Sequence, residues 1–205
     1  MSDPSDVLDA IEAHDLDRLA SLLIGGSDPN AVKPAPPHWS PLHEAINELE
    51  DGGAIEALIL LLRHGARVEG SEVDTPLLMA FYREQRDAVY LLLAAGANTN
   101  VRGLEGDSPL RVAVERGDVS IAATLLRCGA RATINEPGGP TGASALGIAA
   151  MRLDVATIAL LLQAGADPAA LDADHLSARD RLPPRTAENA NARDEADRLL
   201  EQKKP

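Results

Sequence analysis

Aromatic residues are scarce in this sequence. Phenylalanine, tyrosine and tryptophan together make up 2% of the 205 residues, although apolar residues as a whole make up 45%. Leucine and alanine must therefore fill most of the interior. Because β-sheets favour aromatic and β-branched side chains, this composition argues against a β-sandwich built around aromatic residues. It favours helices that approach one another closely over small residues.

Cysteine and long apolar segments are also nearly absent. Cys128 is the sole cysteine, so no intramolecular disulfide bond can form, and a reducing compartment such as the cytoplasm is expected. The apolar run at 57–62 is far shorter than the roughly 20 residues of a membrane-spanning helix. The opening residues, MSDPSDVLD, lack the apolar core of a secretory signal. We therefore expect a cytoplasmic protein that does not enter a membrane.

Basic residues are few for a protein with so many acids. The chain has 19 Lys and Arg against 32 Asp and Glu, which gives a net charge of −13. Nucleic-acid binding requires clustered Lys and Arg, so this class of partner is not expected. Residues 1–69 carry 13 acids and 4 bases. Such an excess can steer a basic protein partner, or it can serve solubility alone.

What the sequence does contain is a repeated phrase. SPLHEAI at 40–46, DTPLLMA at 74–80, SPLRVAV at 108–114 and SALGIAA at 144–150 are variants of one pattern. Each begins with Ser or Thr, or has one as its second residue, which suits a helix N-cap, and three continue with proline, which suits the first helical position. A leucine-rich stretch ending in glycine follows each phrase, and such a glycine typically ends a helix in left-handed conformation.

These signals predict short antiparallel helix pairs. The glycines in register are Gly26, Gly65, Gly96, Gly129 and Gly165, spaced 39, 31, 33 and 36 residues apart. A helix pair of this length cannot bury its own apolar side. Stacking successive pairs joins those sides into one continuous core.

The pattern resembles the ankyrin repeat over about residues 5–200. The resemblance rests on T/S-P-L at the first helix, on L-L-x-x-G-A at the end of the second, and on tails such as GADPAA. It implies an all-α, ankyrin-like solenoid of stacked helix-turn-helix repeats with β-turn fingers, the loops that join successive helix pairs. We expect a single domain over 1–205, with irregular outer repeats and boundaries at about 5–30, 31–69, 70–100, 101–133, 134–170 and 171–200.

No pattern in the sequence indicates enzyme chemistry. The five histidines lack metal-ligand spacing, and Cys128 occupies an ordinary helix-end position. GGPTG at 138–142 lacks the Lys-Ser/Thr ending of a phosphate-binding loop and reads as a finger turn. His43 follows a Ser-Pro-Leu, where the resemblance implies a structural histidine. We expect no catalytic residue, no cofactor and no metal.

The resemblance implies that a partner docks on a concave face made of fingers and first helices. Trp39 and Tyr82 fall in predicted exposed register and are of the type enriched at binding hot spots. Trp39 has an equal alternative, which is packing beneath the proline-rich finger. The predicted partner-binding residues are Trp39, Glu44, Glu48, Glu72, Asp74, Tyr82, Arg83, Glu105, Asp107, Glu115, Arg116, Met151 and Arg152.

The leading functional hypothesis is therefore a non-enzymatic protein–protein interaction module, monomeric alone, that presents an acidic face to a basic protein. Scaffolding, inhibition and toxin neutralisation all fit this hypothesis. One alternative is an enzyme or small-ligand protein with a pocket near the finger at 133–143. Another is a structural module that assembles with copies of itself. Fold alone does not choose among them.

Overall fold

The computed structural model describes residues 5–32, 38–70 and 75–201, and its regular secondary structure over these residues is entirely helical. The chain divides into two compact units, an N-terminal unit of residues 1–98 and a C-terminal unit of residues 99–205. The helices are α1 (Ser5–Glu12), α2 (Leu16–Ile24), α3 (Pro41–Glu48), η1 (Leu49–Asp51), α4 (Ile55–Arg63), α5 (Pro76–Tyr82), α6 (Arg86–Ala94), α7 (Pro109–Glu115), α8 (Val119–Arg127), α9 (Ala145–Met151), α10 (Val155–Gln163) and α11 (Ala190–Glu201). The single domain expected over 1–205 stays a prediction.

The helix boundaries follow the predicted caps. The Thr75 hydroxyl accepts a hydrogen bond from the Leu78 N–H at 3.3 Å, and Ser108 and Ser144 cap α7 and α9 in the same way. Proline occupies the first turn of α3, α5 and α7. The glycines that follow the second helices have φ between 88° and 102°, a region that favours glycine over other residues. The predicted helix starts and ends are therefore confirmed.

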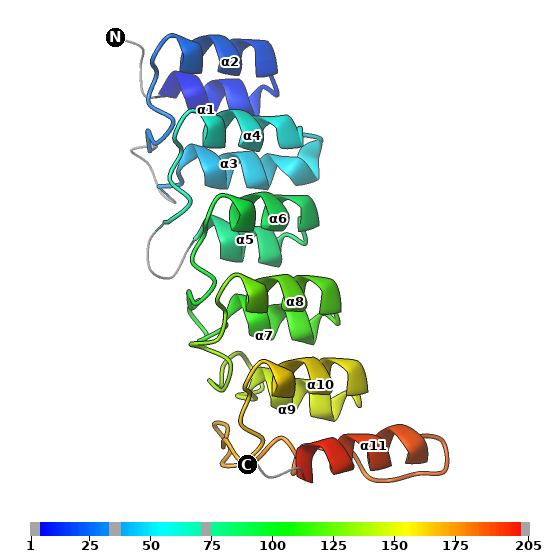
Figure 1. Cartoon of the computed structure of the whole chain (residues 1–205). Coiled ribbons are helices and arrows are strands. Elements are labelled where there is room, and N and C mark those ends of the chain that lie inside the picture. Colours follow the sequence, from blue (N-terminus) through cyan, green and yellow to red (C-terminus); the bar gives the residue numbers. More distant parts are fainter. Residues whose placement is uncertain (1–4, 33–37, 71–74, 202–205) are drawn as a thin grey trace. The chain divides into compact units, whose positions relative to one another are not determined.

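In the N-terminal unit, three helix pairs stack. Within each pair the two helices pack on each other, the first helices form one layer, α1 on α3 on α5, and the second helices form another, α2 on α4 on α6 (Figure 1). Leu58, Leu77 and Leu92 are fully enclosed between the layers. The leucines and alanines of the repeated phrases thus make the core, as the composition requires.

A side chain also ties the first repeat to the second in this unit. The Asn30 side-chain amide donates to the Gly65 carbonyl at 3.2 Å, and its oxygen accepts from the Arg67 N–H at 2.8 Å. One asparagine thus satisfies two backbone groups in the turn that follows α4. Asn100 makes the same kind of contact with the Gly129 carbonyl in the C-terminal unit.

In the C-terminal unit, α7 packs on α9 and α8 on α10, and three fingers bond to one another through the backbone. The Gly139 N–H donates to the Glu105 carbonyl at 2.8 Å, and the Ala173 N–H donates to the Gly142 carbonyl at 3.1 Å. A Cβ at Gly138 would lie 2.2 Å from the Gly106 carbonyl oxygen, so only glycine allows this approach. We call residues 103–107, 136–142 and 172–176 the finger row.

The end of the chain departs from the repeat pattern. The sequence at 171–182 resembles another finger followed by a first helix, but residues 178–182 form only turns. Pro183 and Pro184 follow directly, and the residue before a proline is disfavoured in helical conformation. The chain becomes helical again at Ala190, and α11 packs against α10.

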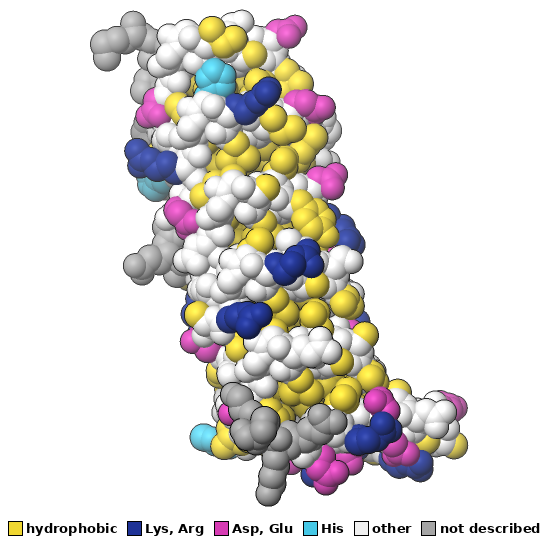
Figure 2. Space-filling view, viewed as in Figure 1, with side chains coloured by type: hydrophobic (Ala, Val, Ile, Leu, Met, Phe, Trp, Pro, Cys, Tyr) yellow, Lys and Arg dark blue, Asp and Glu magenta, His cyan; other side chains and the backbone are white. Residues whose placement is uncertain are grey.

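Ion pairs are concentrated in this terminal segment, and Figure 2 shows acidic and basic side chains gathered over α11. Arg181 Nε lies 2.7 Å from Asp172 Oδ2, and Arg179 Nε lies 2.6 Å from Asp197 Oδ1. Burial acts to raise the pKa of Asp172, but hydrogen bonds from Arg181 and from backbone N–H groups outweigh it and leave that pKa below its usual range. The hydrogen bond from Arg179 lowers the pKa of Asp197.

We expect α11 to loosen selectively in acid. A carboxyl whose pKa is lower in the folded state contributes stability that is complete above its unfolded value, about 3.9 for Asp, and that is lost as the pH falls through the folded value. Amide hydrogen exchange, corrected for its intrinsic pH dependence, should show the protection of α11 falling more steeply than that of α8 between about pH 5 and about pH 2. Equal pH dependence in the two helices would contradict this account.

Candidate functional site

In the N-terminal unit, the ends of the first helices and the turns that follow them carry charged side chains that pair between repeats. His14 Nε2 lies 2.9 Å from Glu48 Oε2, which joins the first repeat to the second. Arg83 Nη1 lies 2.5 Å from Glu50 Oε2, which joins the third repeat to the second. The second repeat reaches both neighbours because its inter-helix loop is longer and begins with η1. We call the ends of these first helices and the turns after them, residues 12–15, 48–54 and 82–85, the hairpin edge.

Tyr82 lies on this edge, at the last position of α5, and is 48% exposed. Its neighbour Arg83 is held against Glu50, so the position of one charged group beside the ring is defined. The predicted exposure of Tyr82 is therefore found. An amphipathic aromatic ring on a fixed backbone is well suited to contact a partner, because little side-chain entropy is lost on docking.

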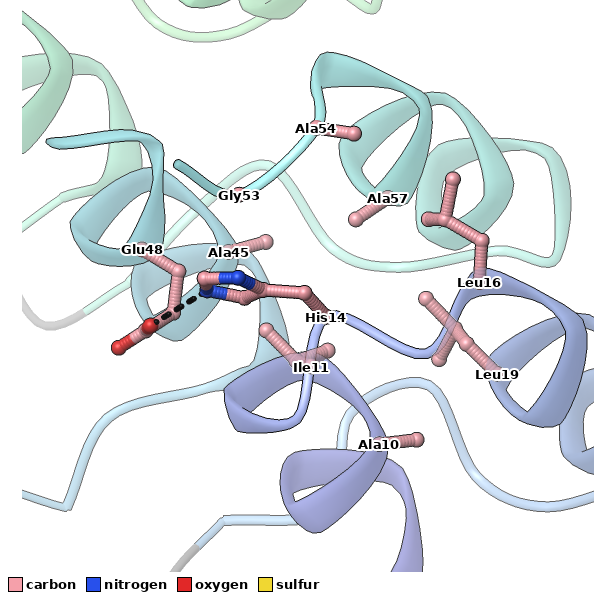
Figure 3. Close-up of a pocket in the computed structure, with 10 residues that line it drawn as sticks. All are labelled: Ala10, Ile11, His14, Leu16, Leu19, Ala45, Glu48, Gly53, Ala54 and Ala57. Carbon is pink, nitrogen blue, oxygen red and sulfur yellow. Dashed lines mark hydrogen bonds and ion pairs between the residues drawn. The ribbon is translucent and has the colours of Figure 1, made fainter. Parts of the chain in front are cut away.

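A small pocket opens at the hairpin edge between the first and second repeats (Figure 3). Its apolar wall comes from both repeats, and the His14–Glu48 pair lies beside it. The empty space, open mouth included, is about 250 Å³. Its enclosed part is only about 10 Å³, room for about one water molecule, so the pocket is too small for a substrate molecule. The lining residues are Ala10, Ile11, His14, Leu16, Leu19, Ala45, Glu48, Gly53, Ala54 and Ala57.

Other predicted positions in this unit have mixed outcomes. Trp39 is half-buried, a position between its two alternatives. Glu44 was expected at the surface of the first helix, and that expectation is wrong, because the residue is buried within α3. His43 is buried beside it, with Nδ1 2.8 Å from Ser40 Oγ, which is a structural cap. Glu72 and Asp74 lie outside the described residues.

In the C-terminal unit, the fingertip at 103–107 projects an apolar side chain. The Gly103 N–H bonds to the Asp107 carbonyl at 2.9 Å and closes a tight turn, which leaves Leu104 86% exposed and Glu105 exposed beside it. Arg102 supports the turn from below, donating to the carbonyls of Gly106 and Pro137. The finger is therefore braced, and its tip presents a leucine and a carboxylate together.

Asp107 was expected among the exposed finger residues, and the structure buries it. Its Oδ1 accepts from Arg111 Nε at 2.7 Å, and Arg111 is only 1% exposed. Arg111 stands in the fourth repeat where His43 stands in the second, and its guanidinium lies so close to Gly139 that a Cβ there would lie 1.8 Å from Nη2. The charge of Asp107 is used inside the molecule, because it compensates a buried cation.

The predicted first-helix positions of this unit lie at or near the surface. Arg116 and Arg152 are exposed, while Glu115 and Met151 are half-buried. Arg152 Nη1 donates to the Glu115 carbonyl at 2.7 Å, so it links the fourth and fifth repeats. These four residues thus share one edge of the stacked pair α7 and α9.

Charge is distributed unequally between the two units. Residues 1–98 contain 17 acids and 6 bases, a net charge of −11, and the remaining residues carry −2. On the face seen in Figure 2, acidic and basic side chains are interspersed, and apolar side chains lie between the rows of helices. The acidity is therefore a property of the whole N-terminal unit and not of a single dense patch on that face.

The described residues form neither a metal-binding cluster nor a membrane-spanning helix. Within 5–32, 38–70 and 75–201, no three His, Cys, Asp or Glu side chains are grouped so that they could hold a metal ion. Over the same ranges, no helix has the length and apolar character needed to cross a bilayer.

Several residues of this surface were not predicted from the sequence. His14 and Glu50 pair with residues about 34 positions away in the chain, and Leu104 lies exposed at a fingertip. The exposure of Leu104 could have been predicted from the sequence, because a large apolar residue between two glycines of a turn has no neighbours to cover it. The partners of His14 and Glu50 depend on how the loop at 49–54 folds, which no local pattern gives.

Comparison with known proteins places these features in context. A family model described as ankyrin repeats in three copies matches residues 7–103 and 77–172. No functionally curated protein matches the sequence. Among solved structures, an ankyrin repeat domain from Acinetobacter baumannii AYE is 24% identical, with a TM-score of 0.76 and 97% of each chain covered.

Two further solved structures have a similar fold. One is the ankyrin repeat domain of Bcl-3, a member of the IkappaB family, at 22% identity and a TM-score of 0.72, covering 96% of this chain and 81% of that one. The other is a chain from the predatory endopeptidase Bd0816 of Bdellovibrio bacteriovorus in complex with immunity protein Bd3460, at 25% identity and a TM-score of 0.68, covering 97% and 98%.

The stacked helix pairs, the capped Ser/Thr-Pro-Leu starts, the bonded fingers and the family model that spans most of the chain agree with one another. The chain belongs to the ankyrin repeat family, whose all-α solenoid fold serves in general as a non-enzymatic scaffold for protein–protein interaction.

Proposed function

We propose that this protein binds a basic protein partner through the exposed hairpin edge of its N-terminal unit, with the fingertip and first-helix edge of the C-terminal unit as further contacts. The observation that carries the proposal is the concentration of charge, −11 of the total −13, in the unit that also presents Tyr82. A potential of one sign raises the association rate of an oppositely charged partner, and an exposed aromatic ring supplies contact energy.

The proposed contact set keeps the predicted residues that are exposed or half-buried, together with Glu72 and Asp74, which lie outside the described residues. It adds Glu50 of the hairpin edge and Leu104 of the fingertip. Glu44 and Asp107 are left out because they are buried. The set is Trp39, Glu48, Glu50, Glu72, Asp74, Tyr82, Arg83, Leu104, Glu105, Glu115, Arg116, Met151 and Arg152.

For the biological role, we favour inhibition or neutralisation of the bound protein over scaffolding. Support comes from the 25% identity to a chain of a complex between a predatory endopeptidase and an immunity protein, with nearly full coverage of both chains. A preformed repeat surface suits this role, because docking onto it orders few additional residues. The alternative small-ligand pocket at 133–143 finds no support in the geometry, since Gly138 packs against the backbone of the neighbouring finger.

We expect reversal of one exposed charge at the hairpin edge to slow association. The partner is first captured from the source cells and identified, and association rates are then measured for Asp51→Lys and for the matched reversal Glu188→Lys in the C-terminal unit. Both acids are exposed, so each change shifts the net charge equally. Asp51→Lys should slow association several-fold at low salt, and Glu188→Lys should have a much smaller effect.

The salt dependence provides the check on this interpretation. At about 1 M salt the Debye length is about 3 Å, so the difference between the two variants should largely disappear. An association rate for Asp51→Lys equal to that of the unmodified protein at low salt would refute the proposed steering. A difference that persists undiminished at high salt would indicate a direct contact at Asp51 in place of steering.

A further inference from the structure

We infer that Leu104, at the fingertip of residues 103–107, anchors the protein partner by entering an apolar pocket on the partner's surface, with a basic side chain at the rim of that pocket facing Glu105. This inference rests on the proposed function, in which the fingertip is one contact among several. It goes further, because it assigns a different kinetic role to each unit. The charge of the N-terminal unit speeds association, and Leu104 slows dissociation.

The turn itself does not require a leucine at position 104. Leu104 is 86% exposed, the largest exposed fraction among the large apolar side chains of the described residues. The last finger contains an equivalent turn, closed by a bond from the Asp172 N–H to the Leu176 carbonyl at 3.0 Å, and Ala173 stands there in the position of Leu104. Since alanine fits this position, the larger side chain of Leu104 is available to a partner without cost to the turn.

The fingertip is held in one conformation before a partner docks. The Gly106 N–H bonds to the Gly103 carbonyl at 2.9 Å inside the turn, and the neighbouring finger supports it through a bond from the Gly139 N–H to the Glu105 carbonyl at 2.8 Å. Docking therefore orders little more than the Leu104 side chain. Burial of a leucine side chain adds most to affinity where little conformational entropy is lost.

The shape of the fingertip requires a concave partner. Among the exposed large apolar side chains of the described residues, Leu104 is the one that lies in the finger row. A single projecting side chain buries most of its surface only in a pocket that surrounds it, because a flat surface covers one side of it alone. A second copy of this chain is not favoured as the occupant, since the pocket between the first two repeats encloses only about 10 Å³ and does not admit a leucine.

The carboxylates of the finger row indicate a cation at the rim of the partner's pocket. Four of the five are paired within the chain: Glu136 with Arg102, Asp107 with Arg111, and both Asp172 and Asp174 with Arg181. The fifth, Glu105, is exposed beside Leu104, and no described Lys or Arg lies within ion-pair distance of it. A basic side chain of the partner facing Glu105 supplies the complementary charge.

The test measures association and dissociation rates separately. The probe is the purified partner protein that the capture experiment above identifies. Leu104→Ala should dissociate at least about ten-fold faster than the unmodified protein, as expected for a binding hot spot. Its association rate should stay within about two-fold at low and at high salt, because the apolar contact forms after the encounter. Its denaturation curve should be unchanged, since the removed side chain is exposed.

Leu171→Ala is the matched control. Leu171 is also an exposed leucine of the C-terminal unit, at 56%, but it lies outside the finger row, so its removal should leave both rates unchanged. Glu105→Gln keeps the shape of the side chain and should speed dissociation several-fold at low salt. In the complex with leucine methyl groups labelled, cross-saturation from the partner's protons should reach Leu104 and not Leu171.

A dissociation rate of Leu104→Ala equal to that of the unmodified protein would overturn the inference. So would equal acceleration by Leu104→Ala and Leu171→Ala, or self-association of the free protein at rising concentration that Leu104→Ala abolishes, since Leu104 would then join copies of this chain. None of these results would touch the proposed steering, which slower association of Asp51→Lys tests independently. Loss of the charge effect at Asp51, with faster dissociation of Leu104→Ala intact, would instead refute the proposed steering alone.

Discussion

Replacing Asp107 by alanine should destabilise the C-terminal unit by about 3 kcal/mol. The change leaves the Arg111 guanidinium, which is 1% exposed, without the carboxylate that accepts its Nε–H at 2.7 Å. Breaking a buried ion pair by removing one partner typically costs about 3–5 kcal/mol, and the lower end applies here because Glu115 still lies 3.1 Å from Arg111 Nη2. The measurement is chemical denaturation followed by circular dichroism.

Two variants show whether the cost comes from the uncompensated charge. Glu105→Ala removes an exposed carboxylate from the same finger and should change the free energy of unfolding by less than about 0.5 kcal/mol. Arg111→Met combined with Asp107→Ala removes both charges, and it should be less destabilised than Asp107→Ala alone. If Asp107→Ala is as stable as the unmodified protein, or if the two changes are additive, the buried pair is not what holds the finger row.

Replacing Leu92 by alanine should cost about 2–5 kcal/mol, the range for large-to-small changes in a packed core. Leu92 lies in α6, is completely buried, and sits where the second helix of the third repeat meets its neighbours. Deleting its branched end leaves a cavity that two short helices cannot close without moving against each other. The loss should appear in denaturation curves followed by a probe within the N-terminal unit.

Ile24→Ala is the matched control for Leu92→Ala. It also shortens a large aliphatic side chain in a second helix of the same unit, but Ile24 is 77% exposed at the end of α2. Its effect should stay within about 0.5 kcal/mol. A cost for Leu92→Ala below about 1 kcal/mol would mean that the helix layers are not packed to the density of a protein core.

The repeats could be predicted from the sequence because their determinants are local. Ser or Thr before Pro-Leu defines the start of a first helix, and Gly129 or its counterparts define the end of a second helix. Each signal is independent of the rest of the molecule, and the recurrence of the signals identifies the fold. The last repeat was expected to be irregular, and it is: Pro183 and Pro184 interrupt the stretch at 171–182 that resembles a finger and a first helix, and a final helix, α11, follows.

The candidate site could be predicted only in part, because burial depends on neighbouring repeats. Tyr82 was correctly predicted to be exposed, whereas Glu44 and Asp107 were expected at the surface and are buried. Met79, Val112 and Ile148 hold the position of Glu44 in the other repeats and are buried as well. In the case of Asp107 the reason is specific: the fourth repeat has Arg111 where others have neutral residues or histidine, and this cation needs a partner. Local propensity carries no information on such pairing.

The pocket between the first two repeats could not be predicted from local sequence patterns either. Its two polar residues, His14 and Glu48, belong to different repeats, and they meet because the second repeat has extra residues between its helices. The insertion was visible in the sequence at about 47–54, but its conformation was not. Gly53 lies so close to the Glu48 carbonyl that a Cβ there would be 2.7 Å from the oxygen, which shows how tightly this loop folds against α3.

Hydrogen exchange on the isolated complex tests most directly the claim that this ankyrin stack binds protein through its hairpin edge. With the captured partner bound, the amides of residues 46–56 and 80–86 should gain protection, while those at the carboxyl ends of α2, α4 and α6 should exchange as in the free protein. Protection confined to those second-helix ends, with residues 46–56 and 80–86 unchanged, would place the partner elsewhere and contradict the account.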